Sequence, residues 1–280
     1  MDKRIIINAD DFGLNSGVNQ AVAQAHTDGV LTSTTIMANM PDAEGAVKLA
    51  KQMPGLGVGV HLNLSEGEPL SNGANINYLL DDSGSFALTP GKLSLLSFYR
   101  HKVRNAIRAE LAAQIQWVID NGLKPTHLDS HKHIHSFPAI FPIVCGLARR
   151  FEIKAIRFIF EPKQLLAMPW PLTSEGGRKR ARTARIMGRI NRIQNSEFRK
   201  TDCLLGVAHM GRIDVNFFKA VAFYNTAATV EIMTHPGLDD GLKCRQGKMW
   251  CKGEFEALCS ERTKQYFRDA GVKLVHYGQL

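Results

Sequence analysis

Acidic residues and histidines follow short apolar runs at four places along the chain. The four segments cover residues 5–13, 57–61, 125–135 and 229–237. If the apolar runs are parallel strands, the polar side chains gather at the carboxyl end of one sheet, where α/β proteins bind ligands. Carboxylates and imidazoles that converge there are typical of a metal-dependent hydrolase.

Asp10 and Asp11 end the first of these runs. One carboxylate of such a pair can bind a metal ion, while the other takes a proton from the bound water. The alternative is a structural pair that forms an Asx turn and caps the helix expected to follow. The residue types alone leave both interpretations open.

Histidines are concentrated in the third segment, because four of the ten in the chain lie within residues 127–135. We expect at least one metal ligand here, and we expect other residues of the segment to hydrogen-bond to the ligand and hold it in place. Metal-bound histidine usually donates its second ring N–H to a carboxylate or carbonyl, a supporting role that suits Asp129 and His133. His61 is a further candidate ligand, for which a structural role is the alternative.

Three more polar residues end predicted strands. His235 precedes a Pro-Gly turn, and a histidine with a pKa near neutrality can protonate a leaving group. Arg157 can orient a catalytic carboxylate through a charge-assisted hydrogen bond, or form an ordinary surface ion pair. His209 can line the pocket or be satisfied within its own loop. The sequence contains no GxGxxG, GxxxxGK[ST], GxSxG or HExxH motif, so the corresponding enzyme classes are not indicated.

These residues must be positioned by strands that alternate with helices. Apolar spacing predicts eight strands, at about residues 4–9, 32–38, 57–62, 125–130, 154–159, 204–208, 228–233 and 272–277. Helical spacing predicts helices at 15–28, 42–52, 104–121, 138–150 and 251–270. The alternation indicates an α/β fold with a parallel sheet, and eight strands favour a TIM-like (β/α) barrel. We expect a single catalytic domain over residues 1–280, with long excursions at about 65–100 and 160–202.

Positive charge is concentrated in the second excursion. The net charge is +9, and residues 163–200 contain ten Lys and Arg against two Glu, which gives +8. A basic amphipathic helix is expected over residues 177–195, after an apolar stretch at 165–172 that contains a tryptophan. This combination fits an anionic membrane surface, whereas a charged helix that caps the barrel is the alternative. The candidate docking residues are Trp170, Arg182, Arg185, Arg189 and Arg192.

Other features bear on partners and location. Nucleic acid is not an expected partner, because the cations lack interleaved aromatic residues. The N-terminus runs directly into a strand pattern without signal-peptide features, and no apolar stretch reaches the roughly 20 residues needed to span a bilayer. The five cysteines form no CxxC pair, which argues against a disulfide framework or a cysteine-based zinc site. We therefore expect a cytoplasmic protein, with the inner face of the membrane as a peripheral site. The oligomeric state stays open.

The motifs resemble those of the YdjC-like carbohydrate deacetylase family, whose best-known type acts on acetylated chito-oligosaccharides. The matching segments, in order, are residues 8–13, 59–62, 126–135 and 231–237. The resemblance covers nearly the whole chain except the basic excursion. It implies a (β/α) barrel variant related to polysaccharide deacetylases, with an Asp-His-His site for one divalent metal ion.

Carried over by position, the implied ligands are Asp11, His61 and His131, with His133 and His135 as alternatives to His131. The resemblance further implies Asp10 as the general base and His235 as the general acid. Zinc is the preferred ion, and nickel, cobalt, manganese and magnesium are alternatives.

Some members of this family are similar to enzymes that act on acetylated sugars carried on lipids, such as acetylglucosaminyl hopanoids. The basic excursion favours that branch. Our hypothesis is a metal-dependent N-deacetylase of an amino sugar, carried on a lipid. Three alternatives stay open: a deacetylase of soluble chito-oligosaccharides, a hydrolase of another amide or a phosphoester, and a non-catalytic sugar- or lipid-binding barrel. Asp10, Asp11 and His235 argue against the last, since binding alone needs no acid, base or metal.

Overall fold

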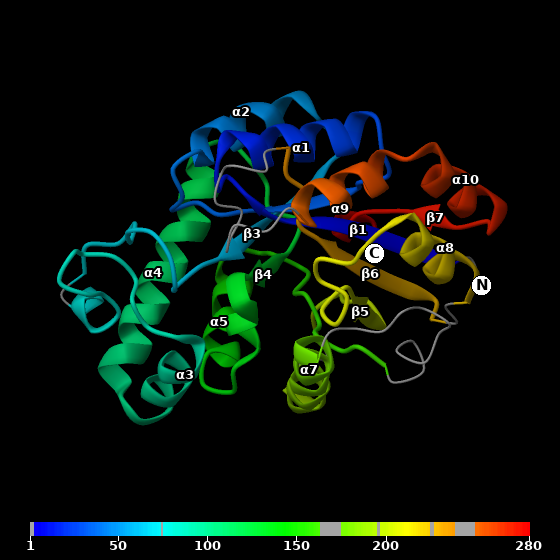
Figure 1. Cartoon of the computed structure of the whole chain (residues 1–280). Helices are drawn as coiled ribbons and strands as arrows, with labels where there is room; N and C mark the ends of the chain where they lie inside the picture. The colour runs from blue at the N-terminus through cyan, green and yellow to red at the C-terminus, as the bar shows by residue number, and fades with distance from the viewer. Residues whose placement is uncertain (1–2, 74, 163–174, 195–196, 225–226, 239–249) are drawn as a thin grey trace.

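Parallel strands form one curved sheet in the computed structural model, which describes residues 3–73, 75–162, 175–194, 197–224, 227–238 and 250–280. Within these residues the spatial order is β4-β3-β2-β1-β6-β5, and β7 pairs with β1 (Figure 1). The bounds are β1 (Arg4–Phe12), β2 (Ser33–Ile36), β3 (Gly57–Leu62), β4 (Leu128–Ser130), β5 (Cys203–Leu205), β6 (Thr229–Thr234) and β7 (Lys273–Leu274).

Helices connect the strands and lie outside the sheet in Figure 1. Their bounds are α1 (Ser16–Thr27), α2 (Ala43–Gln52), α3 (Pro90–Tyr99), α4 (His101–Asp120), α5 (Phe141–Arg150), α7 (Glu175–Gln194), α8 (Val215–Tyr224), α9 (Trp250–Cys259) and α10 (Glu261–Asp269). Short 3₁₀ helices are η1 (Ile76–Tyr78), η2 (His131–Ser136) and η3 (Tyr277–Gln279).

The two edges of the sheet meet through residues 154–160. On one side, Leu128 N donates to Ala155 O at 3.0 Å, and Arg157 N donates to Leu128 O at 2.9 Å. On the other side, Leu204 N donates to Phe160 O at 2.9 Å. The predicted α/β barrel is therefore confirmed as a fold class. The expected fifth strand is not regular, however, because the chain turns where Phe160 N bonds to Phe158 O.

Two other sequence expectations need correction. Among the described residues, the last predicted strand pairs with β1 alone, at Arg4 and Ile5, so it adds to the sheet beside β1. The excursion at 65–100 contains the regular helix α3, which begins at Pro90 after the cap Thr89, whose side chain accepts from Lys92 N. Proline in the first turn after a threonine cap is a recognised helix start.

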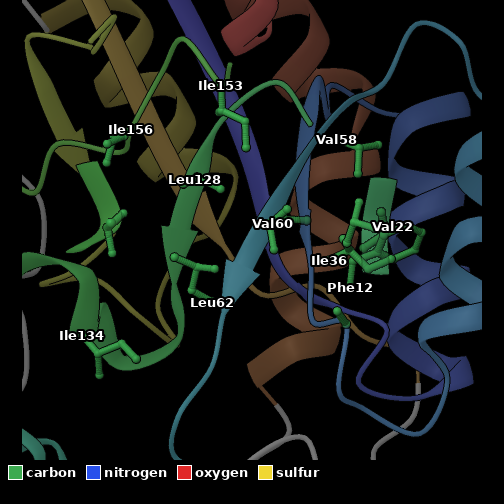
Figure 2. Packing of buried hydrophobic residues seen from close by; sticks show 14 of the residues in the cluster. Phe12, Val22, Ile36, Val58, Val60, Leu62, Leu128, Ile134, Ile153 and Ile156 are labelled. Carbon is green, nitrogen blue, oxygen red and sulfur yellow. The ribbon is translucent and has the colours of Figure 1, made fainter. Parts of the chain in front are cut away.

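The core lies between the sheet and the helices. Ile5, Ile7 and Ala9 alternate along β1 and share one buried cluster with Val18 and Val22 of α1. Figure 2 shows residues of this cluster from several strands packed together. Each buried aliphatic side chain of this size contributes about 1.5–3 kcal/mol to folding. Because β1 alternates, its even-numbered residues face away from these helices.

Polar residues occupy that opposite face of β1. Ile6 belongs to a separate small cluster with Tyr277, while Asn8 and Asp10 are fully or almost fully buried. Burying amide and carboxylate groups is costly unless each is paired. The inside of the curved sheet is therefore where a polar network must form.

The basic helix predicted over 177–195 is present as α7. Arg182 and Arg189 are exposed on it, and Arg185 is half-buried. Trp170 and the side chain of Arg192 lie outside the described residues. Where the structure describes the chain, we find no helix with both the length and the apolar character to cross a membrane.

The cysteines agree only in part with the expectation that the chain lacks disulfides. Cys145, Cys203 and Cys259 are free thiols. Cys251, in contrast, is disulfide-bonded.

Candidate metal centre

An irregularity at the end of β1 brings two adjacent carboxylates into one site. The register between β1 and β2 shifts between Ala9 and Phe12. Asp11 has a φ of 67°, a left-handed conformation that aspartate tolerates better than most residues. Neighbours on a regular strand would point to opposite faces, whereas this turn leaves Asp10 and Asp11 both buried beside His61.

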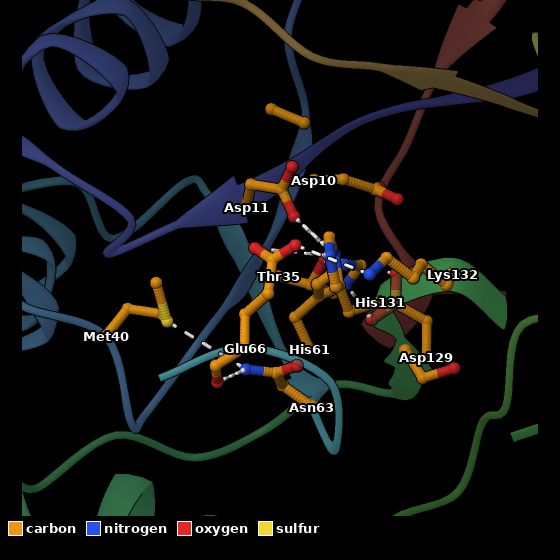
Figure 3. A network of polar contacts seen from close by, with 12 residues as sticks. Asp10, Asp11, Thr35, Met40, His61, Asn63, Glu66, Asp129, His131 and Lys132 are labelled. Carbon is orange, nitrogen blue, oxygen red and sulfur yellow. Dashed lines mark hydrogen bonds and ion pairs between the residues drawn. The ribbon is translucent and has the colours of Figure 1, made fainter. Parts of the chain in front are cut away.

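Asp11 faces two histidines from separate elements (Figure 3). Its Oδ1 atom lies 3.3 Å from Nε2 of His61 on β3 and 3.0 Å from Nδ1 of His131 on η2. One nitrogen or oxygen of each residue lies within 4.8 Å of the other two, and all three residues are buried. Such a set can hold a divalent ion and leave coordination positions open for water or substrate.

The turn after β4 separates the three candidate histidines of η2. Lys132 and His133 have φ values of 53° and 56°, so the chain turns sharply after His131. His135 instead contacts Ser130 Oγ and the carbonyl of Arg157. His133 is half-buried, and loss of solvation together with the Arg157 charge lowers its pKa to about 3. Of the three, the structure brings His131 against Asp11.

Asp129 supports His61 from behind. Its Oδ1 accepts a 2.7 Å hydrogen bond from His61 Nδ1, and its Oδ2 accepts from Thr35 Oγ1 at 3.1 Å. An N–H on Nδ1 leaves the Nε2 lone pair directed at Asp11, as in carboxylate–histidine–metal arrangements. Burial alone would lower the pKa of His61, but the Asp129 and Asp11 carboxylates raise it to about 10.

The donor set suits a cation for two reasons. Two carboxylates face the His61 imidazole, so its surroundings stabilise a positive charge, which either a proton or a metal ion can supply. Nδ1 of His131 faces Asp11 at 3.0 Å, and its buried Nε2, which makes no hydrogen bond to the described residues, lies 3.8 Å from the Glu66 carboxylate, so negative charge stands on both sides of this imidazole as well. One carboxylate and two imidazoles are ligands that zinc, nickel, cobalt and manganese accept.

Arg157 is a buried centre of charge beside this cluster. Its guanidinium forms two hydrogen bonds to Asp10, at 2.6 and 2.7 Å, and ion pairs with Asp129 and Glu231, each at 2.7 Å. Only 1% of Arg157 is exposed, so the surface ion pair considered from the sequence is wrong. Burial alone would raise the pKa of Asp10, but Arg157, with smaller contributions from His61 and His235, holds it below the ordinary range.

His235 follows β6 and is half-buried. Its backbone N donates to Glu254 Oε2 at 2.7 Å, and Gly211 N donates to the other oxygen at 2.9 Å. Glu254, which belongs to α9, is buried, and burial raises its pKa. This carboxyl group joins the loops after β5 and β6 at the same end of the sheet.

His209 lies elsewhere in the loop after β5. Its Nδ1 is 3.8 Å from Glu161 Oε1, and its ring lies against Phe217 with centroids 5.1 Å apart. These are its described side-chain contacts, so the structure does not bring His209 into the Asp11 cluster.

Sequence reasoning missed the support for Arg157. Glu231 is buried in the middle of β6, where it binds Arg157 Nε at 2.8 Å and accepts a hydrogen bond from Tyr277 Oη. A glutamate inside the apolar run 229–233 is an available signal, since buried carboxylates require partners. No comparable signal marks Tyr277, whose partner lies 46 residues away.

Glu66 was also missed. Its carboxylate lies 3.8 Å from His131 Nε2 and 3.4 Å from Lys132 Nζ. Asn63 and Glu110 hold its loop: Asn63 Nδ2 donates to the Glu66 carbonyl at 2.7 Å, and Glu110 accepts from two backbone N–H groups of residues 70–71. Such long-range anchoring leaves no periodic pattern in the sequence.

Comparisons with known proteins identify a family for the chain. A family model described as YdjC-like protein matches residues 4–269. A carbohydrate deacetylase from Brevibacillus brevis is 34% identical over 281 aligned residues, which cover 99% of each chain. A carbohydrate deacetylase from Clostridium beijerinckii is 30% identical and covers 99% of this chain and 100% of its own. The crystal structure of a proposed cellobiose-phosphate cleavage protein from Enterococcus faecalis shares the fold, with a TM-score of 0.77, 24% identity and coverage of 100% of this chain and 99% of its own.

Proposed function

Because the chain belongs to the YdjC-like protein family, we propose that it is a metal-dependent N-deacetylase of an N-acetylated amino sugar. Relatives that align over its full length bear the name carbohydrate deacetylase. The observation that carries the proposal is the buried Asp11, His61 and His131 cluster, whose ligand atoms lie within 4.8 Å of one another.

Asp11, His61 and His131 would hold one divalent ion, with zinc as our first choice. When bound, such an ion would polarise an amide carbonyl and lower the pKa of a water molecule. Asp129 would keep His61 in the tautomer that presents Nε2.

Asp10 would accept the proton of the attacking water. A general base must be ionised at working pH, and the pKa of Asp10 is held low by Arg157. Arg157 would act as a positioning residue, because its two hydrogen bonds fix both carboxylate oxygens of Asp10. Oδ1 of Asp10 also accepts a hydrogen bond from Asn8 Nδ2 at 2.9 Å, so Oδ2 would receive the proton.

His235 would donate a proton to the departing amine, which leaves acetate and a free amino sugar. Its backbone is tied to Glu254 at 2.7 Å, which supports a fixed position for the ring. Histidine is the side chain that most often acts as a general acid in enzymes.

Glu66 gives a first test of the ligand set. Glu66→Gln should weaken metal affinity about tenfold, because removing a group that supports a metal-bound histidine typically costs about 10–100-fold. Equilibrium dialysis against zinc would measure this. Glu68→Gln is the matched control, since Glu68 is an exposed carboxylate of the same loop. Equal affinities in the two variants would contradict the assignment of His131 as a ligand supported by Glu66.

The finer part of the proposal is a sugar carried on a lipid. Its support is the basic helix α7, on which Arg182 and Arg189 are exposed. Each cation near an anionic bilayer contributes about 1 kcal/mol to binding. A soluble chito-oligosaccharide is the alternative substrate, and acetate release from both substrate types, compared as kcat/KM, separates them.

Four arginines of α7 are the test residues. Replacing Arg182, Arg185, Arg189 and Arg192 with Gln should lower acetate release from a vesicle-borne acetylglucosaminyl lipid by roughly a hundredfold or more. High salt should mimic the variant, and release from a soluble chito-oligosaccharide should hardly change. If the variant processes the vesicle-borne substrate like the wild type, α7 is a structural cap and the lipid-borne substrate loses this support.

A further inference from the structure

Helix α3 carries an exposed apolar and aromatic tip. Leu95, Phe98 and Tyr99 are 59%, 63% and 74% exposed, and they are three of the seven large hydrophobic residues exposed within the described chain. The rings of Phe98 and Tyr99 pack edge to face, with centroids 5.2 Å apart. Leu93 and Ser97 on the same helix are buried. The helix therefore uses one side for packing and leaves a second apolar side in solvent.

The sequence on both sides of this tip is basic. Residues 83–109 contain five Lys and Arg and no Asp or Glu. Two of these cations, Arg100 and Lys102, lie directly after Tyr99 and are exposed, as is His101 between them. Apolar and aromatic side chains beside lysine and arginine are the composition of elements that lie in a membrane interface.

Helix α3 lies against the turn that carries a proposed metal ligand. Helix α3 contacts η2, the turn that carries His131, and the basic helix α7 contacts η2 as well. Figure 1 shows α3 and α7 on either side of α5. Two basic elements therefore flank the turn that contributes to the site.

We propose that Leu95, Phe98 and Tyr99 insert into the interface of an anionic phospholipid bilayer, with Arg100 and Lys102 paired to lipid phosphates. Charge complementarity selects this occupant. A second copy of the chain docked through the same tip would bring Arg100 and Lys102 against their own copies, and like charges across an interface are repulsive. Binding of α3 to the bilayer does not depend on the proposed function. The idea that this binding brings the site to a sugar carried on a lipid does rest on the proposed function.

Vesicle co-sedimentation tests the proposal. The probes are phosphatidylcholine vesicles with and without phosphatidylglycerol. The wild type should bind the anionic vesicles, and Phe98→Ser/Tyr99→Ser should bind them at least about tenfold more weakly. Arg100→Gln/Lys102→Gln should weaken binding roughly thirtyfold at low salt and less at high salt. Phe223→Ser is the matched control, since Phe223 is an aromatic residue of α8 that is 45% exposed.

Two further measurements make the result decisive. All variants should keep the wild-type Tm and the wild-type rate on a soluble N-acetylated chito-oligosaccharide, because α3 supplies none of the proposed ligands. Absence of wild-type binding to anionic vesicles, or equal binding by the Phe98→Ser/Tyr99→Ser and Phe223→Ser variants, would overturn the proposal. So would a wild-type dimer that Phe98→Ser/Tyr99→Ser converts to monomer without any loss of vesicle binding. Vesicle binding without acetate release from any substrate would count against the proposed function alone.

Discussion

His61→Ala should lose bound metal and acetate release together while the protein stays folded. His61 provides one of three proposed ligand atoms, and Nε2 lies 3.3 Å from Asp11 Oδ1. Loss of supporting groups alone costs about 10–100-fold in affinity, so we expect loss of a ligand to cost more than about a hundredfold. Asp11→Ala and His131→Ala should behave in the same way. Metal content per chain, measured after dialysis, gives the answer directly.

A suitable control removes a histidine outside the cluster. His101 is exposed at the start of α4, so His101→Ala should keep both metal and activity. Circular dichroism and thermal unfolding would show that the variants are folded. Unchanged metal content in all three ligand variants would contradict the assignment of these residues as metal ligands. Two remaining ligands could compensate for the loss of one, but they could not do so for each of the three in turn.

Asp10→Asn should keep the metal and lose turnover by about 10²–10⁴-fold, the usual contribution of a general base. The amide has nearly the shape of the carboxylate but cannot accept the proton of water. Arg157 retains its ion pairs with Asp129 and Glu231, so we expect the surrounding network to persist. The diagnostic measurement is kcat at saturating zinc, with metal content determined on the same sample. A near-normal kcat would remove Asp10 from the role of base.

The strand-end pattern of the sequence predicts much of the site. Asp11, His61 and His131 each follow an apolar run, and parallel strands bring their carboxyl ends together. The pattern cannot choose among the histidines of η2, because that choice depends on the left-handed conformations of Lys132 and His133. Short turns of this kind leave no periodicity in the sequence.

Other elements depend on partners distant in sequence. Residues 154–160 have the apolar pattern of a strand, but their irregular path is set by hydrogen bonds to β4 and β5. Helix α3 was missed because its exposed Leu95 and Phe98 obscure the one-sided pattern by which core-facing helices are recognised. Glu66 lacks any signal, since its loop is anchored by Glu110 about 40 residues away.

Acetate release by metal-stripped and reloaded protein tests the central claim most directly. We expect the stripped chain to be inactive toward N-acetylated chito-oligosaccharides and acetylglucosaminyl lipids. Titration with zinc should restore activity in proportion to bound metal, with saturation at one ion per chain, and acetate and free amine should form in equal amounts. Reloaded protein that releases no acetate from any of these substrates, or stripped protein that is as active as reloaded protein, would contradict a metal-dependent N-deacetylase.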